Sequence, residues 1–228
     1  MTKGAGAIAE IVDRIDAAYP NASYALVWTT PWELLVGTIL AGGSTDVLAN
    51  RVTAELFVTY PTVHAFAAIE PATLEPAIRS CGFQVAKAKA IVGSAKLLVE
   101  RFGGAPPTTM AEMLELPGVN RKSANVVLCC AYNVAEGIIV DTHVERLAPR
   151  IGLTAPGTAE AIERELTQLV PRDRWTRFGP GLILHGREVC KAKEPACEGC
   201  TLATVCMRAG LPGGAPLPEK PARKKRGS

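Results

Sequence analysis

The stretch Leu114–Val127, "LELPGVNRKSANVV", decides the fold of this chain. Pro117 cannot continue a helix, and Gly118 permits a tight reversal of the backbone. From Lys122 onward, apolar residues return at helical spacing. The preceding segment, "TTMAEMLEL", opens with the spacing of a helix-capping box. We therefore predict a helix–hairpin–helix unit over residues 109–130.

The hairpin places backbone N–H groups at the start of a helix, where they have no partner within that helix. These are the amides of Gly118, Val119, Asn120 and Arg121. Because the helix macrodipole adds positive potential there, the hairpin can bind an anion such as one DNA phosphate, without reading base sequence. An ordinary helical hairpin with solvated amides fits the spacing equally well. We also expect Asn120 to adopt a positive φ and to act as an N-cap.

Lys122 lies in the first turn of the second predicted helix, where the macrodipole disfavours a cation. The same potential favours the neutral amine, which is a nucleophile that can form a Schiff base. The alternative is a lysine that pairs with a DNA phosphate or with a nearby acid.

Asp141 follows the apolar run in "GIIVDTHVERL" and precedes another predicted helix. Thr142 and Glu145 have capping-box spacing, which puts Asp141 just before that helix. Taken alone, Asp141 is best explained as a helix-capping carboxylate. A catalytic role requires it to face Lys122 across a cleft, which spacing does not test. His143 is a candidate contact to a DNA phosphate.

Four of the seven cysteines crowd together near the C-terminal end, with the spacing C-x6-C-x2-C-x5-C: Cys190, Cys197, Cys200 and Cys206. Thiolates this close hold zinc or an iron–sulfur cluster. Zinc usually takes two separated pairs of ligands, and this run has a single C-x2-C. We therefore favour a 4Fe-4S cluster over zinc, and either over four free thiols. Lys191 and Lys193, in the first interval, either neutralise DNA phosphates or balance an anionic cluster.

Composition narrows the class of protein. Nearly half of the 228 residues are apolar and about a fifth are charged, as in a globular soluble protein. No apolar run is long enough to span a bilayer, and the N-terminal segment lacks the apolar block of a signal peptide. With an odd number of cysteines, these features predict a cytoplasmic protein without a disulfide framework. The whole-chain charge of +3 includes a net +4 in the last ten residues, so any DNA-binding surface must be local.

Helical periodicity dominates the chain, and few segments alternate as strands do. The segment "KAKAIVGSAKLLVERFGG", for example, predicts a helix that ends at Gly103–Gly104. The prediction is an all-α fold of about ten helices joined by short Gly/Pro loops. Residues 211–228 are expected to form a disordered basic tail that contacts DNA phosphates or only aids solubility. Nothing suggests an oligomer, so we expect a monomer.

Three motifs together resemble the endonuclease III branch of the helix-hairpin-helix DNA glycosylases: "LPGVNRKSANVVL", "VDTHVERL" and the cysteine spacing. The resemblance covers about residues 5–210. It implies two all-α lobes that bind DNA across the cleft between them. One lobe, residues 25–134, is a six-helix barrel that contains the helix-hairpin-helix motif. The other combines residues 1–24 with residues 135–210 and holds the 4Fe-4S cluster.

The resemblance also implies a reaction and a partner. Family members remove oxidised pyrimidines from duplex DNA and then cut the strand 3′ to the abasic site by β-elimination, so we expect association with the nucleoid. Lys122 matches the family's Schiff-base lysine, and Asp141 matches its catalytic aspartate. The damaged base is flipped out of the stack before it is attacked. The cluster is expected to order its loop and to take no redox part in the cycle.

Two positions depart from the family pattern. Where members usually carry a glutamine that fills the gap left by the flipped nucleotide, this chain has Gly43, preceded by Gly42. Phe83 matches the family's apolar wedge and can fill part of that gap by stacking, although burial in a core is the commoner fate of an aromatic. Gln84 replaces the usual tyrosine after the wedge. We therefore predict a narrower or weaker lesion range than that of a typical member.

Two other functions stay open at this point. A monofunctional glycosylase, such as one that removes adenine or alkylated bases, usually lacks a lysine at the position of Lys122. A non-catalytic DNA-binding protein with the same fold is favoured only by the altered loop at Gly42 and Gly43. Covalent trapping on abasic DNA distinguishes these possibilities from a glycosylase that is also a lyase.

Overall fold

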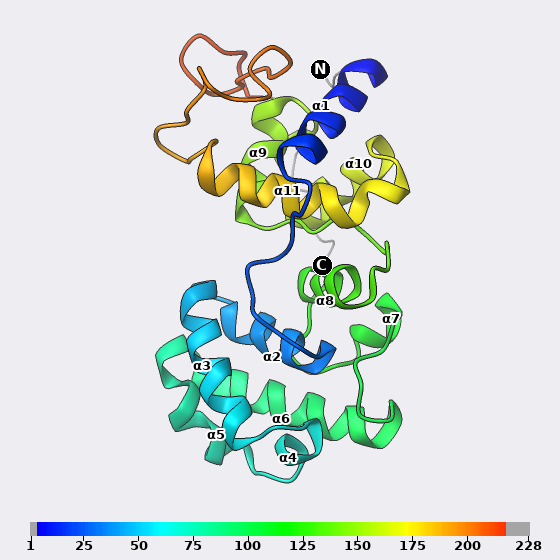
Figure 1. Ribbon diagram of the computed structural model, residues 1–228, viewed down its shortest axis with the longest axis vertical. Coiled ribbons are helices and arrows are strands. Elements are labelled where there is room, and N and C mark those ends of the chain that lie inside the picture. The colour runs from blue at the N-terminus through cyan, green and yellow to red at the C-terminus, as the bar shows by residue number, and fades with distance from the viewer. Residues whose placement is uncertain (1–3, 218–228) are drawn as a thin grey trace, which may run out of the picture. The chain divides into compact units, whose positions relative to one another are not determined.

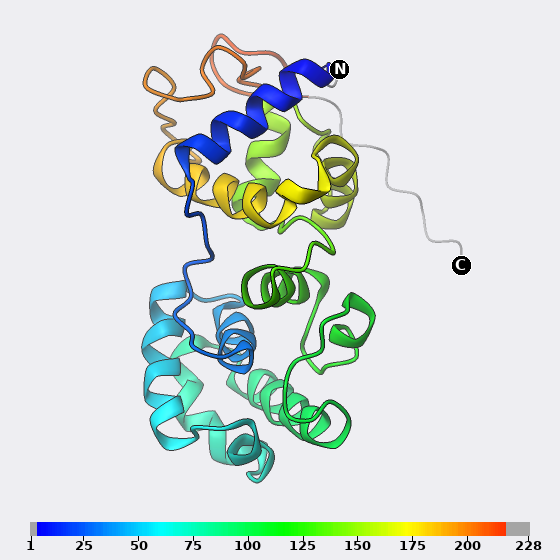
Figure 2. The ribbon, with the colours of Figure 1, turned by 45° about the vertical axis from the view of Figure 1, so that its right-hand side comes forward.

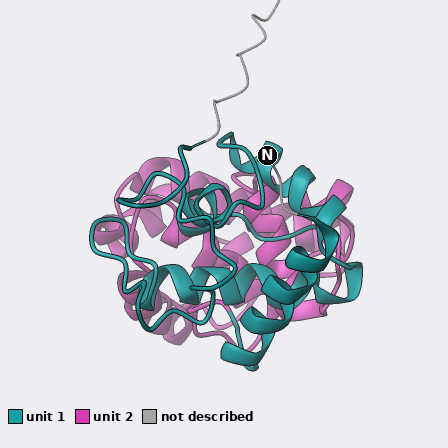
Figure 3. Cartoon of the chain, turned by 90° about the horizontal axis from the view of Figure 1, so that it is seen from above, with its two compact units in different colours: residues 1–23, 137–228 teal, residues 24–136 magenta. Residues whose placement is uncertain are grey.

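The computed structural model of the chain describes residues 4–217. Within this range the chain is helical and contains no strand, which confirms the predicted all-α class. The chain divides into two compact units (Figure 3). Unit 1 combines Met1–Ser23 with Gly137–Ser228, and unit 2 is Tyr24–Glu136. No helix in the described range is both long enough and apolar enough to cross a membrane.

Unit 2 holds seven α-helices and one short 3-10 helix: α2 (Pro31–Ala41), α3 (Asp46–Thr59), α4 (Val63–Ala67), α5 (Pro71–Ile78), η1 (Arg79–Cys81), α6 (Gln84–Arg101), α7 (Met110–Met113) and α8 (Arg121–Tyr132). Apart from Glu33, α2 carries no charged residue, and most of its side chains are buried. A helix that is apolar all round belongs in a core. It accordingly contacts α3, α6 and α8, while α4 and α5 pack on α6 (Figures 1 and 2).

Unit 1 holds four α-helices and one short 3-10 helix: α1 (Ala5–Ala18), α9 (Thr142–Ile151), α10 (Ala159–Leu169), η2 (Arg172–Arg174) and α11 (Trp175–Glu188). In Figure 2, α1 lies along α11, and α9 contacts α11 as well. The apolar stripe of α1 faces this contact, where Gly181 has no side chain and leaves room for Ile15. After α11 the chain continues as loops and turns that carry the four clustered cysteines.

The predicted helix boundaries in unit 2 are set by the expected capping groups. Thr109 caps α7: its Oγ1 accepts from Glu112 N at 3.3 Å and donates to Glu112 Oε2 at 2.6 Å. The helix α6 ends at Arg101, and the amide of Gly104 donates to Leu98 O at 2.9 Å. The expected Thr109 cap and the glycine stop are therefore both present, although the Glu112 carboxylate bonds the hydroxyl of Thr109 and not its amide, as a full capping box would require.

Residues 211–217 are tied to the rest of unit 1. The amide of Ala215 donates to Met207 O at 3.1 Å, and the amide of Gly210 donates to Ala215 O at 2.9 Å. The disordered tail was expected to start at Leu211, whereas these bonds give residues 211–217 a defined turn. The remainder of that tail, including its basic end, lies outside the described residues.

Candidate DNA-binding and catalytic site

The predicted hairpin joins α7 to α8. Gly118 has φ +73°, and a Cβ at this position would run into the side chain of Ala90, so both the turn and the close packing require glycine. The amide of Val119 donates to Leu116 O at 3.1 Å. Leu116 lies outside α8, so this bond agrees with the expectation that the amide has no partner within that helix, but the turn itself uses the Val119 donor.

Asn120 is the N-cap of α8. Its side-chain oxygen accepts from the amide of Ser123 at 2.9 Å. Its backbone is extended, with φ −104° and ψ 173°, so the predicted positive φ is wrong and the predicted cap is right. An N-cap residue leaves the helical region for the extended one, which any residue can adopt. The left-handed position of the hairpin is Gly118, and position 120 has no need of glycine.

Lys122 is the second residue of α8, and its side chain is half-buried. Its Nζ donates to the hydroxyl of Tyr24 at 2.5 Å and lies 4.9 Å from the centre of the Tyr24 ring. Among the described residues, no carboxylate forms an ion pair with Lys122. The amine is thus held by a neutral phenol. Sequence reasoning missed Tyr24, because a contact across 98 positions leaves no spacing signal.

Asp141 is itself the N-cap of α9, which corrects the predicted capping box of Thr142 and Glu145. One oxygen, Oδ1, accepts from the amides of His143 at 2.8 Å and Val144 at 3.0 Å. Within the described part of the chain, the other oxygen takes part in no hydrogen bond or ion pair. Capping therefore uses one half of the carboxylate. Asp141 belongs to unit 1 and Lys122 to unit 2.

The environment of Asp141 is polar and partly charged. Burial raises the pKa of Glu145 in α9, and the nearby carboxylate of Asp141 raises it further. The ring Nδ1 of His143 lies 3.2 Å from a guanidinium nitrogen of Arg146. That same nitrogen of Arg146 donates to Gly186 O at 2.9 Å and to Cys190 O at 3.0 Å, so α9 is fixed to the start of the cysteine loop.

Phe83 and Gly43 lie in contact. Phe83, directly before α6, is 73% exposed and left-handed, with φ 52°. The alternative of a buried core aromatic is therefore wrong. Gly43, in the loop after α2, has φ +71°, and a Cβ there would lie 3.3 Å from Cε2 of Phe83. The phenyl ring thus occupies the space that a side chain at position 43 would need.

Lys87 ties together the two segments that carry Gly43 and Phe83. This side chain is buried, and its Nζ donates to Leu40 O and to Cys81 O, each at 2.8 Å. Burial lowers the pKa of Lys87. The sequence carried one unused signal for this role, a lysine on the face of α6 that otherwise holds small and apolar residues.

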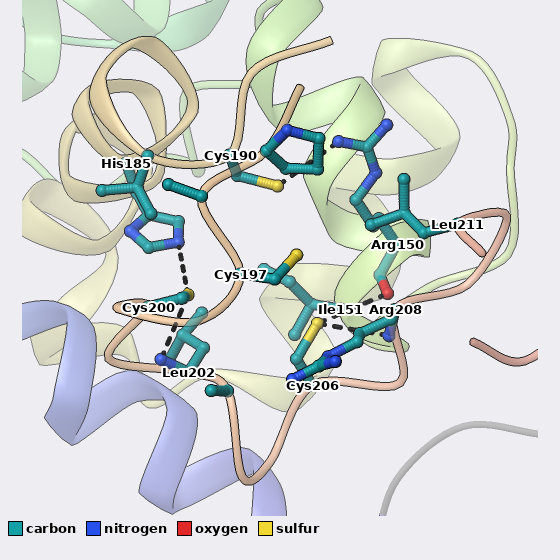
Figure 4. A pocket seen from close by; sticks show the side chains of 14 residues that line it. Arg150, Ile151, His185, Cys190, Cys197, Cys200, Leu202, Cys206, Arg208 and Leu211 are labelled. Atoms are coloured by element: carbon teal, nitrogen blue, oxygen red, sulfur yellow. Dashed lines mark hydrogen bonds between the residues drawn. The ribbon is translucent and has the colours of Figure 1, made fainter. Parts of the chain in front are cut away.

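The four clustered cysteines line a single pocket in unit 1 (Figure 4). Each of three sulfurs has an N–H group beside it. Leu202 N lies 3.3 Å from the sulfur of Cys200, and Arg208 N lies 3.3 Å from that of Cys206. The guanidinium of Arg150 donates to the sulfur of Cys190 at 3.4 Å and to Lys191 O at 2.9 Å.

The thiols that line the pocket also affect one another electrostatically. Burial raises the pKa of the Cys206 thiol, and the neighbouring thiols of the pocket raise it further. His185 is buried; its Nε2 lies 3.4 Å from the Cys200 sulfur, and its Nδ1 lies 3.2 Å from the hydroxyl of Tyr19. Burial lowers the pKa of His185. Lys191 and Lys193 are exposed at the start of the cysteine loop.

The donors of this pocket fit an iron–sulfur cluster in their chemistry. Four free thiols, each a soft ligand once deprotonated, surround one space, and N–H groups point at the sulfurs. Within residues 4–217, no group of three or more His, Cys, Asp or Glu side chains has the arrangement of a metal site.

A helical hairpin with a lysine in its second helix is the architecture of a class of DNA repair protein. Residues 36–172 match the HhH-GPD superfamily of base excision DNA repair proteins. The chain is 44% identical to endonuclease III of Synechocystis sp. over 88% of its length and 91% of that relative. It is 38% identical to endonuclease III of Bacillus subtilis over 86% and 89%. The chain belongs to the endonuclease III family, which confirms the resemblance seen in the three motifs.

A solved structure of an endonuclease III agrees with this assignment. It shows a trapped covalent intermediate of that protein with DNA, in an estranged-adenine complex. Its TM-score with this chain is 0.84 at 35% sequence identity, covering 91% of this chain and 97% of the other. The fold of the two proteins is therefore shared over nearly their whole length.

Proposed function

We propose that this chain is a bifunctional DNA glycosylase and abasic-site lyase of base excision repair, acting on oxidised pyrimidines in duplex DNA. One observation carries the proposal: the Lys122 amine lies in the first turn of α8, held by a phenol and not neutralised by a carboxylate. The amine is therefore not committed to an ion pair within the described residues. The covalent DNA intermediate of the related endonuclease III supports a nucleophile in the fold.

In the proposed reaction, the neutral amine of Lys122 forms a bond to C1′ of the flipped nucleotide while the bond from C1′ to the base breaks. The departing base takes up a proton. The sugar ring then opens: O4′ is protonated, and the Lys122 nitrogen loses a proton as the imine forms. Loss of a proton from C2′ supplies the electron pair that expels the 3′ phosphate.

The second oxygen of Asp141 is the proposed electrostatic group. As the base leaves, C1′ gains positive charge, which a carboxylate stabilises. The first oxygen keeps its two hydrogen bonds to the start of α9, so the group is held in one orientation while its other oxygen stays available to the substrate. Capping and catalysis are then compatible tasks of one side chain.

DNA is proposed to bind through the hairpin and the wedge. The exposed backbone of Gly118 and Asn120 meets one phosphate, and Arg121 and His143 add contacts to the backbone of the duplex. Phe83, resting on Gly43, inserts into the stack next to the flipped nucleotide. Lys191 and Lys193 extend the contact along the strand. The affinity should fall steeply with salt, because phosphates dominate such an interface.

We further propose that Cys190, Cys197, Cys200 and Cys206 hold a 4Fe-4S cluster. When bound, the cluster supplies four strong bonds that cross-link a loop with little secondary structure of its own. Arg146 and Arg150 then connect this loop to α9, and hence to Asp141 at the start of that helix. No step of the proposed reaction uses the cluster.

The test is trapping with borohydride on duplex DNA that contains one abasic site. The wild-type protein should give a covalent adduct, and Lys122→Gln should give none while still binding the DNA. Lys89→Gln, an exposed lysine in α6, is the matched control and should trap normally. Release of a damaged base without any adduct would favour a monofunctional glycosylase. Binding without base release or adduct would favour a non-catalytic relative.

A further inference from the structure

We infer that Tyr24 is a positioning residue for the Lys122 amine; this inference rests on the proposed function of that lysine. The hydroxyl and the ring face of Tyr24 both contact Nζ, at 2.5 Å and 4.9 Å from the ring centre. The hydroxyl oxygen accepts one N–H of the amine, and the ring presents its negative face to the nitrogen. Together they fix the nitrogen at the start of α8 before DNA arrives.

Tyr24 is itself held rigidly, as a positioning residue must be. Its side chain is 7% exposed, and its backbone N–H donates to the thiol of Cys130 in α8. The next residues are fixed by Asn50 of α3, whose side chain donates to Ala25 O at 3.0 Å and accepts from Val27 N at 2.9 Å. The phenol therefore has little freedom, and its hydroxyl defines where Nζ can rest.

Other titratable groups on the packed elements are engaged elsewhere. Glu33, the titratable residue of α2, is bonded to Thr29, and Glu112 of α7 is bonded to Thr109. On α8 itself the ionisable neighbours are Arg121, Cys129, Cys130 and Tyr132, and the two thiols share a hydrogen bond. None of the described carboxylates in unit 2 forms an ion pair with Lys122. Removal of the Tyr24 hydroxyl should therefore change how firmly Nζ is held.

One variant tests the hydroxyl contact, and a second variant is its control. Tyr24→Phe removes the hydroxyl and keeps the ring. Tyr132→Phe is the matched control: it removes a hydroxyl on the same helix that donates to Pro106 O at 2.5 Å, far along α8 from Lys122. In single-turnover trapping at saturating enzyme, Tyr24→Phe should react about tenfold more slowly near neutral pH, with unchanged affinity for DNA, while Tyr132→Phe reacts like wild type.

A second readout needs no DNA. In uniformly 13C-labelled protein, the Cε signal of Lys122 is assigned with Lys122→Gln, and its relaxation gives an order parameter that reports how freely this carbon moves. Loss of the hydroxyl releases the amine end of the side chain, so the order parameter should fall in Tyr24→Phe. It should not change in Tyr132→Phe.

The outcomes decide the inference and the proposed function separately. If wild type gives no adduct, the lyase function fails, and the order parameter of Lys122 Cε still decides the role of Tyr24. If wild type traps and Tyr24→Phe matches it in rate and in order parameter, the positioning role is wrong and the function stands. A slower Tyr24→Phe whose order parameter is unchanged would reduce Tyr24 to a packing residue and overturn the inference.

Discussion

The edge of the Phe83 ring covers Gly43, and a Cβ at Gly43 would lie 3.3 Å from Cε2 of that ring. Both residues have a positive φ, and both are exposed. Buried Lys87 bonds to carbonyls just before each of them, at Leu40 and Cys81. Gly43 stands where the family resemblance implies a gap-filling glutamine. The absence of that side chain is accompanied by an aromatic ring in the adjoining space.

Gly43→Ala should lower the free energy of unfolding by more in the wild-type background than in the Phe83→Ala background. Gly43 has φ +71°, and the strain of alanine at a positive φ, about 1–2 kcal/mol, is the same in both backgrounds. The excess comes from the added Cβ, which would lie 3.3 Å from Cε2 of Phe83. Urea unfolding of the two single variants, the double variant and the wild type measures this difference, and equal losses in the two backgrounds would contradict the contact.

The lesion range should be narrower than that of a relative that retains the glutamine. A phenyl ring fills space by stacking, and offers no hydrogen bonds to the orphaned base opposite the lesion. Side-by-side turnover on thymine glycol and other oxidised pyrimidines, with endonuclease III of Bacillus subtilis as reference, checks this expectation. Equal rates over the whole panel would show that Phe83 and Gly43 replace the glutamine fully.

Lys87→Met should destabilise the protein by about 2 kcal/mol, because two buried carbonyls lose their donors. The difference between wild type and variant should also grow with pH. Burial lowers the pKa of Lys87 in the folded protein below its ordinary value of 10.5. At a pH between the folded and the unfolded pKa, the unfolded chain therefore binds more protons than the folded one. Wild-type stability therefore rises through that window relative to the variant, since the neutral amine keeps its two N–H bonds.

Denaturant unfolding at several alkaline pH values, read as the wild-type minus variant difference, isolates this group from other titrations. Lys89→Met, an exposed lysine in the same helix, should show neither the loss nor the pH trend. A flat difference across the alkaline range would mean that Lys87 keeps its ordinary affinity for protons.

Asn120→Gly should be nearly neutral for stability, whereas Asn120→Ala should cost about 1 kcal/mol. The side chain caps the amide of Ser123, and its extended backbone suits any residue. Glycine tolerates the loss of that cap better than alanine does at an N-cap. Thermal unfolding of both variants measures the order. If Asn120→Gly were the more damaging change, the added backbone freedom of glycine would outweigh its better fit to an N-cap position.

Cys197→Ala should abolish the brown colour and most of the bound iron, about four atoms per chain in the wild type. Cys81→Ala, a buried cysteine in unit 2, should keep both. Iron and zinc analysis beside the visible spectrum distinguishes the two metals. A colourless wild-type protein with stoichiometric zinc would refute the cluster.

Sequence reasoning succeeded where the chemistry is local. The hairpin, the Asn120 cap and the helix ends follow from residues within a few positions of each other, and the family follows from three such motifs. It failed where contacts are remote. The phenol of Tyr24 on Lys122 and the carbonyls bound by Lys87 join segments far apart in the chain, and no spacing rule connects them. For α9, the capping-box spacing of Thr142 and Glu145 was misleading, whereas the prediction of Asp141 as a helix-capping carboxylate is confirmed.

Asn120 and Lys122 stand two residues apart in the first turn of α8. Covalent geometry therefore fixes the Cα of Lys122 close to the start of α8, and the contact with Tyr24 fixes where the flexible side chain ends. Under the proposed function, a hairpin that binds one phosphate would then present the amine to sugars at a single offset along the strand. A change of that offset would need an insertion or deletion inside this turn, or a substitution at Tyr24.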